Sequence, residues 1–198
     1  ALPADAITAL QKRFDPRVGL VLSGDPTGAA LRVTSSPTAT PILTVVYGLA
    51  GAFPTLGDDA KSADLLRAWA GDPKALSNLT NDGSPPLLFM TPETRAALGL
   101  ILGQPSAQAR IVITDSARLA SAVWAARPAS LAILPFDQLD QRWKLIQIDG
   151  VNLFERTANL AAYPLILRVG ALGDPALARA FGPPQTNRDP ARMAVVAM

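Results

Sequence analysis

Three strand-to-helix turns carry the residues of this chain that could bind a ligand. They are Phe53-Pro54-Thr55, Thr91-Pro92-Glu93-Thr94 and Asp115-Ser116. Hydroxyl groups at the start of a helix lie beside free backbone N–H groups, and such positions attract anions. The same residue types also have a purely structural role, because Thr, Asp and Ser are common helix caps. Capping is the favoured interpretation at the second and third turns, and anion binding is the alternative.

Six residues in or near these turns and in the turn at 135–137 are candidates for lining a ligand-binding cleft. They are Phe53, Thr55, Thr91, Arg95, Ser116 and Phe136. In the second turn Pro92 removes a backbone donor and Glu93 places a negative charge where an anion would sit. A small polar or anionic ligand is the expected partner of this set.

Several kinds of catalysis are excluded by composition. The 198 residues include no Cys and no His, so thiol catalysis, His-based triads and Cys/His zinc sites cannot occur. Two acidic pairs, Asp58-Asp59 and Asp137/Asp140, could serve acid–base chemistry, but solvated turns are favoured because no second functional group accompanies them. The chain also lacks GxGxxG, GxxxxGK[ST] and SxxK. We expect no enzyme, no metal site and no cofactor.

The charge pattern and hydropathy restrict the partners and the location. The net charge is +2, from 18 basic and 16 acidic residues that are scattered along the chain, so nucleic acid is not expected as a partner. No apolar run approaches the roughly 18 residues of a membrane span. We expect an extracytoplasmic protein (periplasmic, cell-surface or secreted), with any leader or membrane anchor in a segment before Ala1.

Hydrophobic periodicity predicts alternating strands and helices. The predicted helices comprise residues 4–14, 63–70 (capped by Ser62), 92–102, 116–126 and 174–181. The predicted strands comprise residues 18–22, 31–34, 42–49, 87–90, 110–114, 131–134, 145–148, 165–169 and 193–198. In the helix at 63–70 the residues Leu65, Leu66 and Trp69 are expected to form an apolar stripe. The three Trp residues are expected to serve packing, and a platform for sugar binding is the alternative.

This alternation predicts an α/β fold with mixed, largely parallel sheets. We expect residues 1–181 to form one domain of two α/β lobes, with crossings between the lobes near residues 80–90 and 131–170. Residues 182–198 are expected to be a Pro-rich linker and a strand that leads to a further domain. In largely parallel sheets all the strand-to-helix turns meet at one edge, which is why the six candidate residues are grouped into one cleft.

Several segments resemble known families. The segments are YGLAGAFPTLGDDAKSADLLRAWAG at residues 47–71, AILPFDQLDQRWKLIQIDGVN at 132–152 and AAYPLIL at 161–167. They resemble type 2 periplasmic solute-binding proteins of the phosphate-binding kind. They are also similar to the domain that precedes the metallophosphatase-like domain in bacterial CapA-type poly-gamma-glutamate capsule synthesis proteins.

The resemblance implies a two-lobed solute-binding fold without catalytic activity, followed by a metallophosphatase-like domain of the same chain. The family's Ser-Gly-Thr phosphate turn corresponds to residues 90–95, where Pro92 and Glu93 depart from it. Two functions follow as hypotheses. The first is a solute-binding-like module of a capsule-synthesis protein, and the second is a scaffold domain that has lost its ligand and docks on its own catalytic domain or on a partner.

Overall fold

The computed structural model describes residues 2–3, 6–7, 10, 28–36, 38–53, 55–179 and 182–189. Of the predicted helix at 4–14, the described residues 6, 7 and 10 are helical, and Ala6 and Leu10 are buried. The predicted strands at 18–22 and 193–198 lie outside the described residues. No helix in the described part of the chain is long and apolar enough to cross a membrane.

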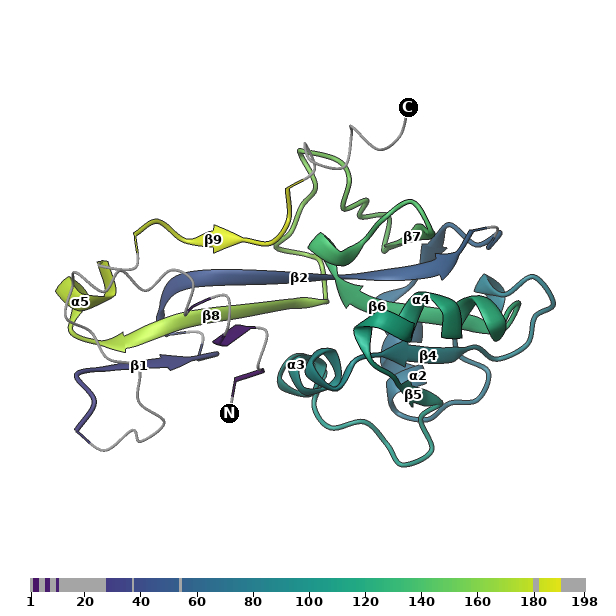
Figure 1. The fold of residues 1–198 in the computed structure, drawn as a ribbon, viewed down its shortest axis with the longest axis horizontal. Helices are drawn as coiled ribbons and strands as arrows, with labels where there is room; N and C mark the ends of the chain where they lie inside the picture. The colour runs from purple at the N-terminus through teal and green to yellow at the C-terminus, as the bar shows by residue number, and fades with distance from the viewer. Residues whose placement is uncertain are drawn as a thin grey trace.

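One long strand organises the described fold. Strand β2 (Thr40–Ala52) has 13 residues, and all but three of them are buried. It contains the predicted strand at 42–49 and extends it at both ends. Figure 1 shows β2 running through both ends of the molecule, with different strands beside its two halves. The described strands therefore form one mixed sheet with β2 at its centre.

At one end, the second half of β2 is antiparallel to two strands. Its partners are β6 (Ser130–Pro135) and β7 (Trp143–Ile148). Beyond β6 lie β4 (Leu87–Met90) and β5 (Ile111–Ile113), and β6, β4 and β5 are mutually parallel neighbours. Helix α3 (Pro92–Leu102) follows β4, and helix α4 (Ser116–Ala125) follows β5 and packs on β4 and β6. The strands and helices predicted for this region are confirmed to within two residues at their ends.

At the other end, the first half of β2 is antiparallel to β8 (Ile166–Gly173), which in turn pairs with β1 (Leu31–Thr34). Helix α5 (Pro175–Arg179) follows β8, and Asp174 caps it by accepting a hydrogen bond from the Ala176 N–H at 2.7 Å. The short strand β9 (Gln185–Thr186) lies along the free edge of β2.

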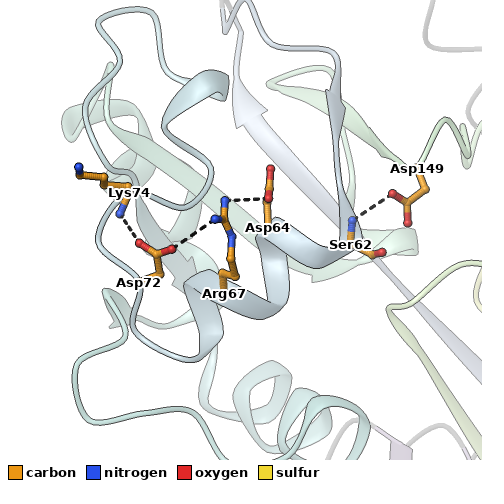
Figure 2. A network of polar contacts seen from close by, with 6 residues as sticks. All are labelled: Ser62, Asp64, Arg67, Asp72, Lys74 and Asp149. Atoms are coloured by element: carbon orange, nitrogen blue, oxygen red, sulfur yellow. Dashed lines mark hydrogen bonds and ion pairs between the residues drawn. The ribbon is translucent and has the colours of Figure 1, made fainter.

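Helix α2 (Ser62–Trp69) shows a cap that differs from the prediction. The cap residue is Lys61, whose side chain makes no capping bond, and Ser62 is the first helical residue. The Ser62 N–H, which has no partner within the helix, donates to Oδ1 of Asp149 at 3.1 Å, as Figure 2 shows. Asp149 lies in the turn after β7. Leu65 and Trp69 are buried as predicted, but Leu66 is 49% exposed, so the predicted stripe was wrong at Leu66.

Short elements complete the described chain. Strand β3 (Asp59–Ala60) pairs with β7, and the single turns η2 (Ser77–Leu79) and η3 (Phe136–Gln138) lie in connections. Residues 149–165 lead from β7 at one end of the sheet to β8 at the other. The division into two lobes, with its crossings near residues 80–90 and 131–170, stays a prediction.

The expectation of largely parallel sheets was wrong. The mixed α/β class is confirmed, but the longest ladders, those of β2 with β6, β7 and β8, are antiparallel. Parallel pairing is confined to shorter ladders such as β5–β4–β6. The cause is that the chain re-enters the sheet beside β2 after a reversal of direction, which local periodicity does not record.

Asn187 completes the hydrogen bonding at the middle of β2. Its Oδ1 accepts from the Val46 N–H at 2.7 Å, and its Nδ2 donates to the Val46 carbonyl at 3.1 Å. The Asn187 side chain thus makes the two hydrogen bonds that a residue of a neighbouring strand would otherwise make to Val46. Val46 lies in the part of β2 between the residues that pair with β9 and those that pair with β7. Unpaired backbone groups in a buried strand are costly, so this contact is expected to contribute to stability.

We predict that Asn187→Ala lowers the free energy of unfolding by about 1–2 kcal/mol, because both polar groups of Val46 lose their partner. Urea unfolding followed by circular dichroism measures this. The control is Gln185→Ala, an exposed residue of β9, which is expected to change stability by less than about 0.5 kcal/mol. Equal stabilities of the two variants would contradict the assigned role of Asn187.

Candidate functional site

The carboxyl edge of β5, β4 and β6 is the first candidate site. Because these strands are parallel, their carboxyl ends lie at one edge of the sheet, and ligands of α/β proteins commonly bind beyond such an edge. Helix α3 begins directly after β4 and helix α4 soon after β5. The structure therefore places Thr91, Arg95 and Ser116 on this edge, as the sequence predicted.

Thr91 is committed to the helix that it starts. It is 6% exposed, its Oγ1 accepts from the Thr94 N–H at 3.2 Å, and its hydroxyl lies 3.2 Å from Oγ1 of Thr94. The preferred capping interpretation is confirmed here. Thr91 has no exposed polar group to offer a ligand.

Arg95 and Ser116 are exposed on the same edge. The Arg95 guanidinium has no side-chain partner among the described residues. Ser116 is the first residue of α4, and Asp115 caps that helix by accepting from the Arg118 N–H at 2.9 Å. An anion at this edge would meet the positive charge of Arg95, but at the start of α4 it would also meet the carboxylate of Asp115.

Phe136 does not line an open cleft. It is 1% exposed, and its ring centroid lies 5.8 Å from that of Phe154 in a tilted arrangement. It follows β6 at the carboxyl edge, as expected, but its side chain belongs to the hydrophobic core. An aromatic residue in a turn is often assigned to a binding surface. The burial of Phe136 shows that it contributes to the core instead.

Phe53 and Thr55 lie at the opposite edge of the sheet. They follow the carboxyl end of β2, and because β2 is antiparallel to β6, that end lies beside the amino end of β6. The Thr55 hydroxyl donates to the Ala52 carbonyl at 2.7 Å, which closes the turn. The six predicted residues therefore do not form one site, because their grouping assumed that β2 was parallel to its neighbours.

A surface hollow of about 560 Å³ opens at this second edge. The residues that define it here are Phe53, Ala120, Ser121, Trp124, Arg142 and Trp143, and we call it the β2–α4 hollow. Phe53 is 65% and Trp124 is 47% exposed, whereas Trp143 is 9% exposed at the base of β7. Trp69 and Trp143 pack in the core, as predicted, whereas Trp124 packs against Arg127 and leaves about half of its surface exposed. The signal in the sequence was Ala120, which lies one helical turn before Trp124 and leaves space beside its ring.

Lys144 holds residues 55–58 beside this hollow. Its Nζ donates to the carbonyls of Thr55 and Leu56 at 2.7 and 3.2 Å and pairs with Oδ1 of Asp58 at 2.5 Å. The Oδ1 of Asn81 accepts a further hydrogen bond from the Leu56 N–H at 3.0 Å. The loop is therefore tied to β7 and to the segment after η2.

The acidic pairs serve structure. Asp59 pairs with Lys61 and accepts from the Gly150 N–H, and hydrogen bonds from Lys61 hold the pKa of the Asp59 carboxyl below its ordinary value. Asp140 accepts hydrogen bonds from the Arg142 guanidinium, which likewise lower its pKa. A general acid at neutral pH needs a raised pKa, so neither group suits that role. The described residues include no group of three Asp, Glu, His or Cys that could hold a metal ion.

We compared the sequence and the fold with those of known proteins. No family model and no curated protein matches the sequence. Among solved structures, an ABC-type phosphate transport receptor from Vibrio cholerae superposes with a TM-score of 0.54 at 11% identity, over 77% of this chain and 64% of the receptor. PstS from Borrelia burgdorferi gives 0.51 at 9% identity, over 81% and 68% of the two chains.

A possible phosphate binding protein from Planctomyces limnophilus gives a TM-score of 0.50 at 12% identity, over 73% of this chain and 56% of that protein. The chain shares its fold with these phosphate-receptor-type binding proteins. The predicted resemblance to periplasmic binding proteins is thereby confirmed at the level of fold. The chain spans about 64% of the length of the Vibrio receptor.

We predict a pH-dependent contribution from the Asp140–Arg142 pair. The pKa of Asp140 is lowered in the folded state, so the pair stabilises the fold above the ordinary pKa of 3.8 and this contribution disappears as the pH falls through the lower folded value. Asp140→Asn should lower the free energy of unfolding at pH 7 by no more than about 1 kcal/mol, since the pair is partly exposed.

Urea unfolding of both proteins at a series of pH values measures this effect. The difference between them should stay constant from pH 7 to about 5 and shrink below about 4. A difference that persists unchanged at the lowest pH would contradict a charge-based role for Asp140.

Proposed function

We propose that this chain is a non-catalytic solute-binding-like module that holds a small polar or anionic ligand. The observation that carries the proposal is the shared fold with phosphate-receptor-type binding proteins, one of them a phosphate transport receptor by name. Fold alone does not fix a ligand, so the choice of ligand class rests on the residues at the carboxyl edge.

The carboxyl edge offers one group that suits an anion. Arg95 is exposed near the start of α3, and a guanidinium can bind phosphate or carboxylate oxygens in a bidentate way. Ser116 adds an exposed hydroxyl near the start of α4. Glu93 and Asp115 place negative charge on the same edge, which favours a weakly charged ligand such as a carboxylate over a multiply charged phosphate.

The proposed setting is a capsule-synthesis protein outside the cytoplasm. Its support is the likeness of two short segments to the CapA-type domain, namely Pro135-Phe136-Asp137 and the Asp-Gly-Val-Asn segment that begins at Asp149-Gly150. Glutamate or a poly-gamma-glutamate segment is then the ligand of choice. A metallophosphatase-like domain after residue 198 would supply any hydrolytic activity.

A scaffold domain without a ligand is the second candidate function. It is favoured by the commitment of Thr91 to its helix cap and by the burial of Phe136, which remove two of the six expected cleft residues. In this alternative the domain keeps the fold of a binding protein and contributes a docking surface.

We predict that glutamate or a short poly-gamma-glutamate oligomer raises the melting temperature of the chain more than phosphate does. A ligand present at 100 times its Kd stabilises the folded state by about 2.7 kcal/mol, which differential scanning fluorimetry detects readily. Arg95→Ala should abolish the shift, because it removes the cation of the carboxyl edge. Arg179→Ala on α5, an exposed arginine at the other end of the sheet, should retain it.

The outcomes separate the two candidate functions. A shift that Arg95→Ala removes and Arg179→Ala retains supports binding at the carboxyl edge. No shift with phosphate, glutamate or oligoglutamate would overturn the binding proposal and favour the scaffold. A shift that both variants retain would place the ligand elsewhere.

A further inference from the structure

We propose that the β2–α4 hollow is a docking site for a protein partner, which inserts an aromatic or large aliphatic side chain there and places a carboxylate beside Arg127. This site is separate from the carboxyl edge, because the antiparallel pairing of β2 with β6 puts the two at opposite edges of the sheet. The proposal therefore does not depend on solute binding.

The hollow exposes apolar side chains that a chain of this size would ordinarily bury. Two of the lining side chains show this: Phe53 is 65% exposed and Trp124 is 47% exposed. Leu56, three residues after Phe53 in the sequence, is 72% exposed but does not line the hollow. A contiguous patch of exposed apolar side chains is typical of an interaction surface. Aromatic residues of this kind also supply most of the binding energy at protein interfaces.

The surface is held in place before any partner arrives. The Lys144 ammonium binds two carbonyls and one carboxylate of the loop that carries Phe53 and Leu56. At Gly57 the loop backbone is so close to η2 that an added Cβ would lie 2.8 Å from Cα of Leu79. A loop fixed in this way loses little conformational entropy on binding, which favours affinity.

A cation beside the hollow selects an acidic partner. Arg127 does not line the hollow itself but packs on Trp124, which does. The Arg127 guanidinium lies 3.6 Å from the centroid of the Trp124 ring, and its Nε donates to the Trp124 carbonyl at 2.8 Å. It has no carboxylate partner in the described part of the chain. Arg142, in contrast, is neutralised by Asp140. One oriented and uncompensated guanidinium beside an aromatic ring therefore favours a carboxylate next to the inserted side chain.

The size of the hollow agrees with a peptide segment. Its volume of about 560 Å³ lies within the range of roughly 300–1,000 Å³ that is typical of ligand sites. Ser121 adds an exposed hydroxyl to the lining; it donates to the Arg118 carbonyl at 2.9 Å, and its oxygen can accept a hydrogen bond from an N–H of the peptide backbone. An acidic segment with one large apolar residue thus matches the lining, the charge and the volume.

Selection from a phage library of random 12-residue peptides on the whole immobilised chain tests the proposal. We expect enriched peptides to carry an aromatic or large aliphatic residue within two positions of Asp or Glu. Synthetic copies of the enriched peptides should protect Trp124 from acrylamide quenching, while Trp69 and Trp143 are already shielded by burial.

Three variants give the expected pattern. Trp124→Ala should weaken binding at least about tenfold, as loss of an aromatic anchor does. Arg127→Gln should weaken acidic peptides about two- to fivefold and leave their Asp→Asn and Glu→Gln versions unaffected. Leu66→Ala on α2, which removes an apolar side chain of matching 49% exposure outside the hollow, should change nothing.

The proposal is overturned by several clear results. These are no enrichment, enriched peptides without the apolar–acidic pairing, or equal binding by Trp124→Ala and Leu66→Ala. Light scattering of the chain alone tests whether a second copy of the chain occupies the hollow. Self-association that Trp124→Ala abolishes would assign the hollow to a second copy of the chain and would also overturn it.

Discussion

The hydrogen bonding of β2 on both of its edges is the constraint on which the rest of the structure depends. A strand of 13 residues spans about 43 Å, and its buried backbone groups need partners along both edges. One edge is paired with β8 and then β6, and the other with β9, Asn187 and β7. Each half of β2 thereby organises its own group of strands, and the two groups share one hydrogen-bonded sheet.

The direction of β2 also decides where the two candidate surfaces lie. Because β6 runs antiparallel to β2 and parallel to β4, the start of α3 is at one edge and the turn after β2 is at the other. Helix α4 has 10 residues and is about 15 Å long, so it reaches from Ser116 at the carboxyl edge towards Trp124 at the hollow. A solute at one edge and a protein at the other could therefore bind at the same time.

The turns after β6 and β7 and the segment before β8 support the architecture more than they offer chemistry. Asp149 caps α2 from the turn after β7, and the buried Tyr163 hydroxyl donates to the Tyr47 carbonyl at 2.9 Å. Phe136 packs in the core against Phe154. These contacts join residues that are far apart in the sequence and fix the path of the chain from β7 to β8. Their role is consistent with a shared fold and is separate from the ligand site proposed at the carboxyl edge.

The sequence by itself determined the local elements and the kinds of chemistry available. Helix α3 begins after Thr91 and ends before Gly103, as the capping rules predict from near neighbours in the sequence. The lack of Cys and His excludes thiol, His-triad and Cys/His zinc sites by residue type alone. Only the tertiary structure decided strand direction, the burial of Phe136, the cap supplied by Asp149 and the exposure of Trp124. These features depend on contacts between distant parts of the chain. Strand direction in particular is not encoded locally, because parallel and antiparallel strands have the same pattern of apolar residues.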